Sequence, residues 1–114
     1  MPYRRRALSV AVNEFGSTFY LHLSGDFDRG GVGRVEKALG RLAQTPVPRR
    51  VVIDIQRLSF LDSAGLRTIL RADERGRAEG FGVDVVRPRG AAARVFTLTR
   101  AGQKLSMIDA PGLG

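Results

Sequence analysis

The segment that most constrains the fold is residues 51–70, VVIDIQRLSFLDSAGLRTIL. It opens with four β-branched residues, Val51, Val52, Ile53 and Ile55. Such a run is typical of a buried strand. Apolar residues then recur at the spacing of one helix face, Leu66, Ile69 and Leu70. Because Asp62 and Ser63 lie between the two patterns, the segment predicts a strand, a turn and a helix, with Ser63 at or beside the helix N-cap.

The rest of the chain supplies further strands and helices. Period-2 patterns over 7–13 and 18–24, separated by a turn over 14–17, predict an antiparallel hairpin. An acidic, glycine-rich loop is expected over 24–31. A helix is predicted over 31–44, ending at the prolines of 45–48, and a strand over 50–56. A second helix is predicted over 63–79, stopping at Gly80, and a strand over 81–86. A third helix is predicted over 91–100, ending at 101–102, with a short strand or turn in the tail.

This order, β-β-α-β-α-β-α, predicts an α/β fold. We expect a mixed sheet of about four to five strands packed with about three to four helices on one or both faces. The length of 114 residues suits one domain, with its core over about 7–110 and a basic N-terminal extension over 1–6.

The formal net charge of +8 would suit an acidic partner, such as nucleic acid or an anionic surface. Most of the basic residues are arginines, and they are spread along the whole chain. On the predicted helix, Arg67, Arg71 and Arg75 form a row at i, i+4 and i+8, with Asp73 and Arg77 as an i, i+4 pair. Few aromatic residues accompany these arginines, so a base-stacking surface is not indicated and no nucleic-acid partner is expected.

Composition also limits the chemistry. The chain has no cysteine and a single histidine, His22, so that neither a metal site nor another cofactor is expected. We interpret His22 as a surface-facing strand residue that does not activate Ser63, and the turn lacks the G-x-S-x-G pattern of hydrolases, so no enzymatic activity is expected. Apolar runs are shorter than the roughly 20 residues of a membrane span, and no secretory signal is evident, which predicts a cytoplasmic protein without a membrane partner.

Three segments together resemble a known family. The sequence DIQRLSFLDSAGLRTIL, 54–70, resembles the strand, turn and D-S-[ST]-G-L helix start of STAS domains, especially anti-sigma factor antagonists. SGDFDRGGVGRVEKAL, 24–39, is similar to the family's acidic loop and first helix, and AAARVFTLTRAGQKLSMI, 91–108, to its C-terminal helix and strand. The chain departs from the pattern at Ala64, where a second hydroxyl is common, at Arg67, and in its positive charge.

The resemblance implies a partner-switching protein. An anti-sigma factor serine kinase would bind the unphosphorylated chain and release its sigma factor, and phosphorylation of Ser63 would end that binding. The resemblance places Asp28 and Asp62 beside the phosphoacceptor, and we expect Ala64, Gly65 and Arg67 to complete the partner-binding surface. A serine phosphatase is left open as a second partner, and a monomer is expected. A STAS subunit of a transporter or stressosome-like complex is the alternative within the family.

The helix start also has an expected electrostatic role. The amides of Ala64, Gly65 and Leu66 and the positive end of the helix dipole are predicted to receive a phosphate on Ser63, with Arg67 within reach. Without the phosphate, either Ser63 or Asp62 can cap the helix.

Overall fold

The computed structural model describes residues 4–42, 44 and 50–110. Their elements are, in chain order, β1 (Ser9–Phe15), β2 (Thr18–Phe27), α1 (Arg29–Leu42), β3 (Arg50–Leu61), α2 (Ser63–Glu79), β4 (Gly82–Val86), α3 (Gly90–Thr99), α4 (Ala101–Lys104) and β5 (Ser106–Ile108). The predicted α/β class and the order of its first seven elements are confirmed, and α4 and β5 follow them. The predicted proline stop over 45–48 lies outside the described residues.

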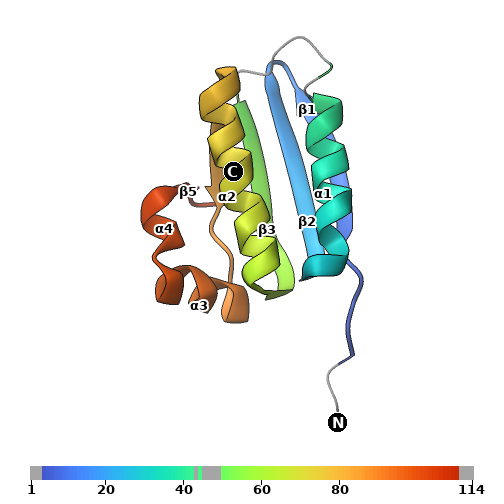
Figure 1. Ribbon diagram of the computed structural model, residues 1–114, viewed down its shortest axis with the longest axis vertical. Coiled ribbons are helices and arrows are strands. Elements are labelled where there is room, and N and C mark those ends of the chain that lie inside the picture. Colours follow the sequence, from blue (N-terminus) through green and yellow to red (C-terminus); the bar gives the residue numbers. More distant parts are fainter. Residues whose placement is uncertain (1–3, 43, 45–49, 111–114) are drawn as a thin grey trace.

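The five strands form one mixed sheet in the order β1-β2-β3-β4-β5. β1 and β2 are the predicted antiparallel hairpin, and every later pair is parallel. Parallel neighbours need a crossover connection, and α1, α2 and the α3–α4 segment supply these connections. Figure 1 shows α1 and α2 lying side by side across the same face of the sheet.

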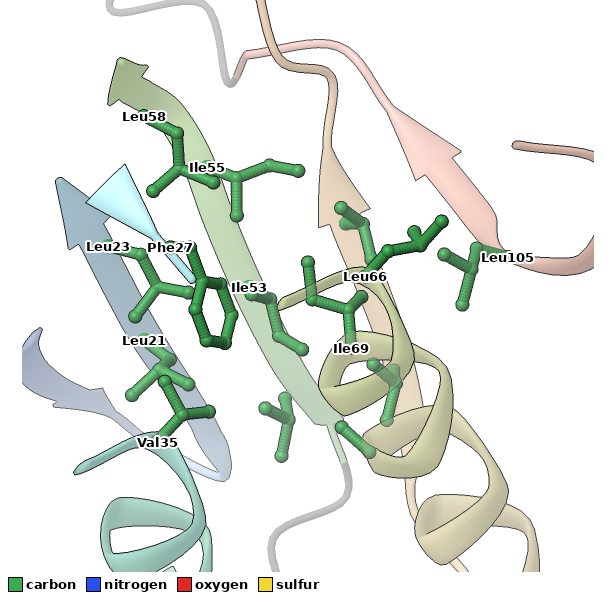
Figure 2. Packing of buried hydrophobic residues seen from close by; sticks show 14 of the residues in the cluster. Leu21, Leu23, Phe27, Val35, Ile53, Ile55, Leu58, Leu66, Ile69 and Leu105 are labelled. Atoms are coloured by element: carbon green, nitrogen blue, oxygen red, sulfur yellow. The ribbon is translucent and has the colours of Figure 1, made fainter. Parts of the chain in front are cut away.

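The core fills the space between this face and the helices. Alternate strand residues such as Leu21, Leu23 and Ile53 point toward the helices, as Figure 2 shows. Ile69 of α2 and Val35 of α1 meet them from the other side. Each fully buried aliphatic side chain of this kind contributes about 1.5–3 kcal/mol of transfer free energy, so this layer holds α1 and α2 against the sheet.

Two strands are longer than the sequence predicted. β2 continues to Phe27 and β3 to Leu61, so that the stretch over 24–27 is strand and the expected loop there is wrong. Parallel pairing between the two strands continues through two register shifts, and it supplies hydrogen-bond partners that a local sequence pattern does not reveal.

The N-terminal segment lies along the end of β2. The Asp26 amide donates to the Arg6 carbonyl at 2.9 Å, and the Arg6 amide donates to the Asp26 carboxylate at 2.9 Å. Gly25 adopts a φ of +89°, and a Cβ atom there would lie 2.6 Å from the Ala7 carbonyl oxygen. Glycine therefore permits the close approach that brings Arg5 and Arg6 to this end of the sheet.

The C-terminal region contains one element more than predicted. The helix over 91–100 is confirmed as α3, which ends at Arg100 with a φ of 59°. The chain then forms α4, where an end to helical structure was expected, and β5 extends the sheet beyond β4. Gly80 ends α2 as predicted, with a left-handed φ of 88° and its amide bonded to the Gly76 carbonyl. Among the described residues, no helix combines the length and apolar character needed to cross a bilayer.

Candidate functional site

The site residues gather at the edge where β2 and β3 end. Phe27 and Leu61, the last residues of these strands, are partners in the parallel register. The residues that follow them, Asp28 and Asp62, therefore leave the sheet side by side, and the Asp62 amide donates to the Phe27 carbonyl at 3.2 Å. The helices α1 and α2 begin at this edge, which lies at the lower end of Figure 1. Helix N-termini carry partial positive charge, so this edge favours anions.

Asp62 caps α2. Its backbone is extended, and its carboxylate accepts a hydrogen bond from the Gly65 amide at 2.9 Å. Ser63 is the first helical residue, and its side chain is exposed and makes no hydrogen bond to another described residue. The cap that the sequence left open between these two residues is therefore Asp62. The hydroxyl of Ser63 has no structural task at the helix start.

We predict that Asp62→Ala lowers the free energy of unfolding by about 1 kcal/mol, because the Gly65 amide loses its acceptor. Asp62→Asn keeps an acceptor oxygen, so we expect most of the stability to return. Urea denaturation of the three proteins measures the effect. Equal losses in both variants would contradict the assignment of Asp62 as the cap.

Gly65 allows α2 to approach the end of β2. A Cβ atom at this position would lie 2.5 Å from the Phe27 carbonyl oxygen and 2.7 Å from Leu61 Cδ1. Both neighbours are fixed, one as backbone and the other in the core. The absence of a side chain thus sets the distance between the serine-bearing turn and the Asp28 loop.

Asp28 caps α1 and pairs with the N-terminal segment. Its carboxylate accepts a hydrogen bond from the Gly30 amide at 2.9 Å. It also accepts hydrogen bonds from both Nε and Nη2 of Arg5, at 2.7 Å each. Hydrogen bonding to Arg5 lowers the pKa of Asp28 below its ordinary value, although partial desolvation opposes the shift. Bidentate arginine pairs of this kind hold the carboxylate in one orientation.

This contact predicts a pH dependence. Because the pKa of Asp28 is lowered in the folded chain, its stabilising effect is present above the pKa of the unfolded chain and is lost as the pH falls through the folded value. We expect Arg5→Gln to move the pKa of Asp28 upward in an NMR titration of the carboxyl carbons. Arg4→Gln is the matched control and should leave this pKa in place. An unchanged pKa in Arg5→Gln would contradict the pairing.

The structure changes the expected phosphate contacts. The amide of Gly65 is bonded to the Asp62 carboxylate, and that of Leu66 to the Asp62 carbonyl at 3.0 Å. The expectation that these two amides are available to a phosphate on Ser63 is therefore wrong, because the Asp62 cap already uses them. Of the three predicted amides, that of Ala64 has no acceptor among the described residues, and Arg67 is exposed one turn further along α2.

Of the predicted partner-binding residues, Asp28, Asp62, Ser63, Ala64 and Gly65 all lie at this edge. Sequence reasoning missed two of their neighbours. Arg5 was assigned to a basic extension, and only the three-dimensional contact reveals its pairing with Asp28. Phe60 lies near the end of β3 and is 42% exposed. An aromatic residue three positions before Ser63 is the sequence signal that could have found it.

The arginine row on α2 is largely paired. Arg71 contacts Glu36 of α1 at 3.1 Å, and Arg75 contacts Glu79 at 2.7 Å. The predicted pair of Asp73 with Arg77 is confirmed at 3.2 Å. Exposed ion pairs contribute little stability, but the carboxylates offset the charge of Arg71, Arg75 and Arg77 that a nucleic acid would meet. The absence of a nucleic-acid partner stays a prediction.

Comparison with solved structures gives three informative neighbours. An anti-sigma factor antagonist from Mycobacterium paratuberculosis is 26% identical with a TM-score of 0.79, over 91% of this chain and 87% of the other. The antagonist SpoIIAA in its unphosphorylated form is 23% identical with a TM-score of 0.76, over 91% and 90%. The phosphorylated form of SpoIIAA from Bacillus is 20% identical with a TM-score of 0.71, over 91% and 93%. The SpoIIAA structures share the fold.

These neighbours define a class of small α/β domains that share this fold. The family described as "Mlab, STAS domain" matches residues 10–109. This match covers most of the chain, so the protein belongs to the STAS domain family, and the resemblance seen in its sequence is confirmed. A comparison with curated protein sequences finds no match.

Proposed function

We propose that this protein is an anti-sigma factor antagonist controlled by phosphorylation of Ser63. In this proposal the unphosphorylated chain binds an anti-sigma factor that is itself a serine kinase, and the bound sigma factor is released. The single observation that supports the site most strongly is the exposed Ser63 hydroxyl, which begins α2 while Asp62 does the capping. The similarity to an antagonist from Mycobacterium paratuberculosis supports the role.

The local geometry suits a phosphoacceptor. Ser63 is exposed and is followed by Ala64, which has a small side chain, so a kinase can bring the γ-phosphate of ATP to the Ser63 oxygen. The oxygen forms a bond to phosphorus, ADP leaves, and the hydroxyl proton is released. The stable Asp62 cap keeps α2 intact after the reaction, so the change is confined to the exposed surface.

Phosphorylation would act on the interface with the partner. A phosphoserine adds a charge of about −1.5 to −2 at neutral pH, beside the carboxylates of Asp28 and Asp62. Arg5 already neutralises Asp28, and Asp62 is half-buried at the cap. A partner surface packed on Ser63 would have to remove water from this new charge, which disfavours the phosphorylated complex.

Incubation with ATP and a serine-kinase anti-sigma factor from the same genome tests the proposal. We expect the chain to gain one phosphoryl group, located on Ser63 by peptide mass spectrometry. Ser63→Ala should gain none, whereas Ser17→Ala, which changes an exposed serine in the β1–β2 turn, should be modified like the wild type. Equal modification of Ser63→Ala would overturn the assigned site. Failure of every such kinase to bind the chain would favour the transporter or stressosome-like alternative.

A further inference from the structure

The face of the sheet opposite α1 and α2 carries a hollow of about 730 Å³. Volumes of roughly 300–1,000 Å³ are usual for small-molecule sites. Its lining includes Tyr20 and His22 of β2, Val52 and Asp54 of β3, and Val86 of β4. Strand alternation explains this set, because the neighbours of these residues in sequence point into the core on the other side.

A hydrogen-bond network fixes the polar part of this hollow. His22 Nδ1 lies 3.0 Å from the Asp54 carboxylate, and its Nε2 lies 3.3 Å from the Asn13 amide nitrogen. Asp54 also accepts hydrogen bonds from the backbone and side-chain amides of Gln56, at 3.1 and 3.0 Å. Burial raises the pKa of Asp54, but the hydrogen bonds from Gln56 and His22 outweigh it, so the pKa lies below its ordinary value.

Hydrogen bonds from Gln56 and the contact with His22 thus hold the Asp54 carboxylate in place within the protein. The His22 ring stacks on Tyr20, with ring centres 6.2 Å apart and planes within 10°. The two partly exposed rings give the hollow apolar surface, and Val52 and Val86 lie beneath it in the lining. A ligand with an apolar, preferably planar, body matches this surface.

Two arginines add positive charge to the same hollow. A register shift between β2 and β3 places Ser24 opposite Arg57, whereas His22 pairs with Asp54. The extra residue in β3 brings both Gln56 and Arg57 to the lining. Arg89, which follows β4, is the second lining cation. Both arginines are exposed, and neither forms an ion pair with a carboxylate among the described residues.

We infer that this hollow is a binding site for a small organic anion. The ligand's apolar body lies against the Tyr20 and Val52 side chains, and its carboxylate or phosphate head is held by Arg57 and Arg89. Guanidinium groups suit both heads because they donate in a planar fork. This site lies on the sheet face, apart from the turn of Ser63, and does not depend on phosphorylation of that serine.

Titration with 8-anilinonaphthalene-1-sulfonate, a planar apolar anion, tests this site by fluorescence on the full chain. We expect the probe to bind saturably while the chain still unfolds cooperatively. In the double variant Arg57→Gln/Arg89→Gln we expect the affinity for the probe to fall at least tenfold. The control Arg41→Gln/Arg94→Gln removes the same charge from exposed helix positions and should bind like the wild type. The affinity for the uncharged analogue N-phenyl-1-naphthylamine should fall less than twofold in either double variant.

A second variant tests the location. Ala11 of β1 lines the hollow, so Ala11→Trp should fill it and abolish binding of the probe, with folding checked by circular dichroism. Displacement of the probe by octanoate or by octyl phosphate then identifies the preferred head group, with octanol as the neutral comparison. No probe binding by the wild type, equal losses in the control pair, or full binding by folded Ala11→Trp would each overturn the inference.

Discussion

Gly65→Ala should lower the free energy of unfolding by about 2 kcal/mol, within the roughly 1–3 kcal/mol found when a packed core receives an extra carbon. The new Cβ atom would lie 2.5 Å from the Phe27 carbonyl oxygen and 2.9 Å from Phe27 Cγ. Neither atom can move without displacing the end of β2. Alanine is more favourable than glycine in a helix by about 1 kcal/mol. The steric clash must therefore cost more than this gain for the free energy of unfolding to fall.

Urea denaturation at neutral pH measures the change, with the dependence on denaturant checked for two-state behaviour. Gly33→Ala is the matched control, since this glycine lies on the exposed face of α1 with nothing within 4 Å of an added Cβ. There we expect a gain of roughly 0.5–1 kcal/mol, because only the helix preference changes. Equal effects of the two substitutions would show that α2 does not approach β2 as closely as the structure has it.

Ser63→Asp should weaken binding of the anti-sigma factor by at least a hundredfold, which corresponds to about 2.8 kcal/mol. The added carboxylate would sit beside Asp62 at the start of α2, where the proposed partner excludes water. Ser63→Ala removes only an exposed hydroxyl that makes no hydrogen bond to another described residue. The affinity of this variant should therefore stay within threefold of the wild type. Isothermal titration calorimetry with the purified partner measures both changes.

Ser17→Asp provides the control of equal charge. Ser17 is exposed in the β1–β2 turn, which lies at the opposite end of β2 from Asp28. We expect the partner to bind this variant like the wild type. A loss of affinity as large as that of Ser63→Asp would indicate a general effect of negative charge, in contradiction to a specific site at the start of α2.

Local patterns in the sequence predicted much of the fold. The β-branched run at Val51 located β3, because a strand buried on both faces has consecutive apolar residues. The helical spacing from Leu66 onward located α2, because a helix buried on one face has apolar residues every three or four positions. The ends of β2 and β3 were missed. Residues 24–27 contain turn-forming types, and they are held in a strand by pairing with β3 and with the segment around Arg6.

The candidate site could be predicted in part. A family resemblance and the strand–turn–helix order were sufficient to place Asp62 and Ser63, and the register of β2 with β3 then brings Asp28 beside them. The pairing of Arg5 with Asp28 joins residues that are far apart in sequence, so no periodic pattern encodes it. The hydrogen bonds of His22 likewise join β2 to Asn13 of β1 and to Asp54 of β3, and these strands lie side by side only in the assembled sheet.

The most direct test of the proposed function compares one preparation of the protein before and after phosphorylation. The anti-sigma factor kinase and ATP modify the chain, the phosphoprotein is isolated, and its affinity for the same partner is measured by calorimetry. We predict one phosphoryl group on Ser63 and at least a hundredfold weaker binding, restored when a phosphatase removes the group. Equal affinity of the two forms would contradict control of binding through Ser63.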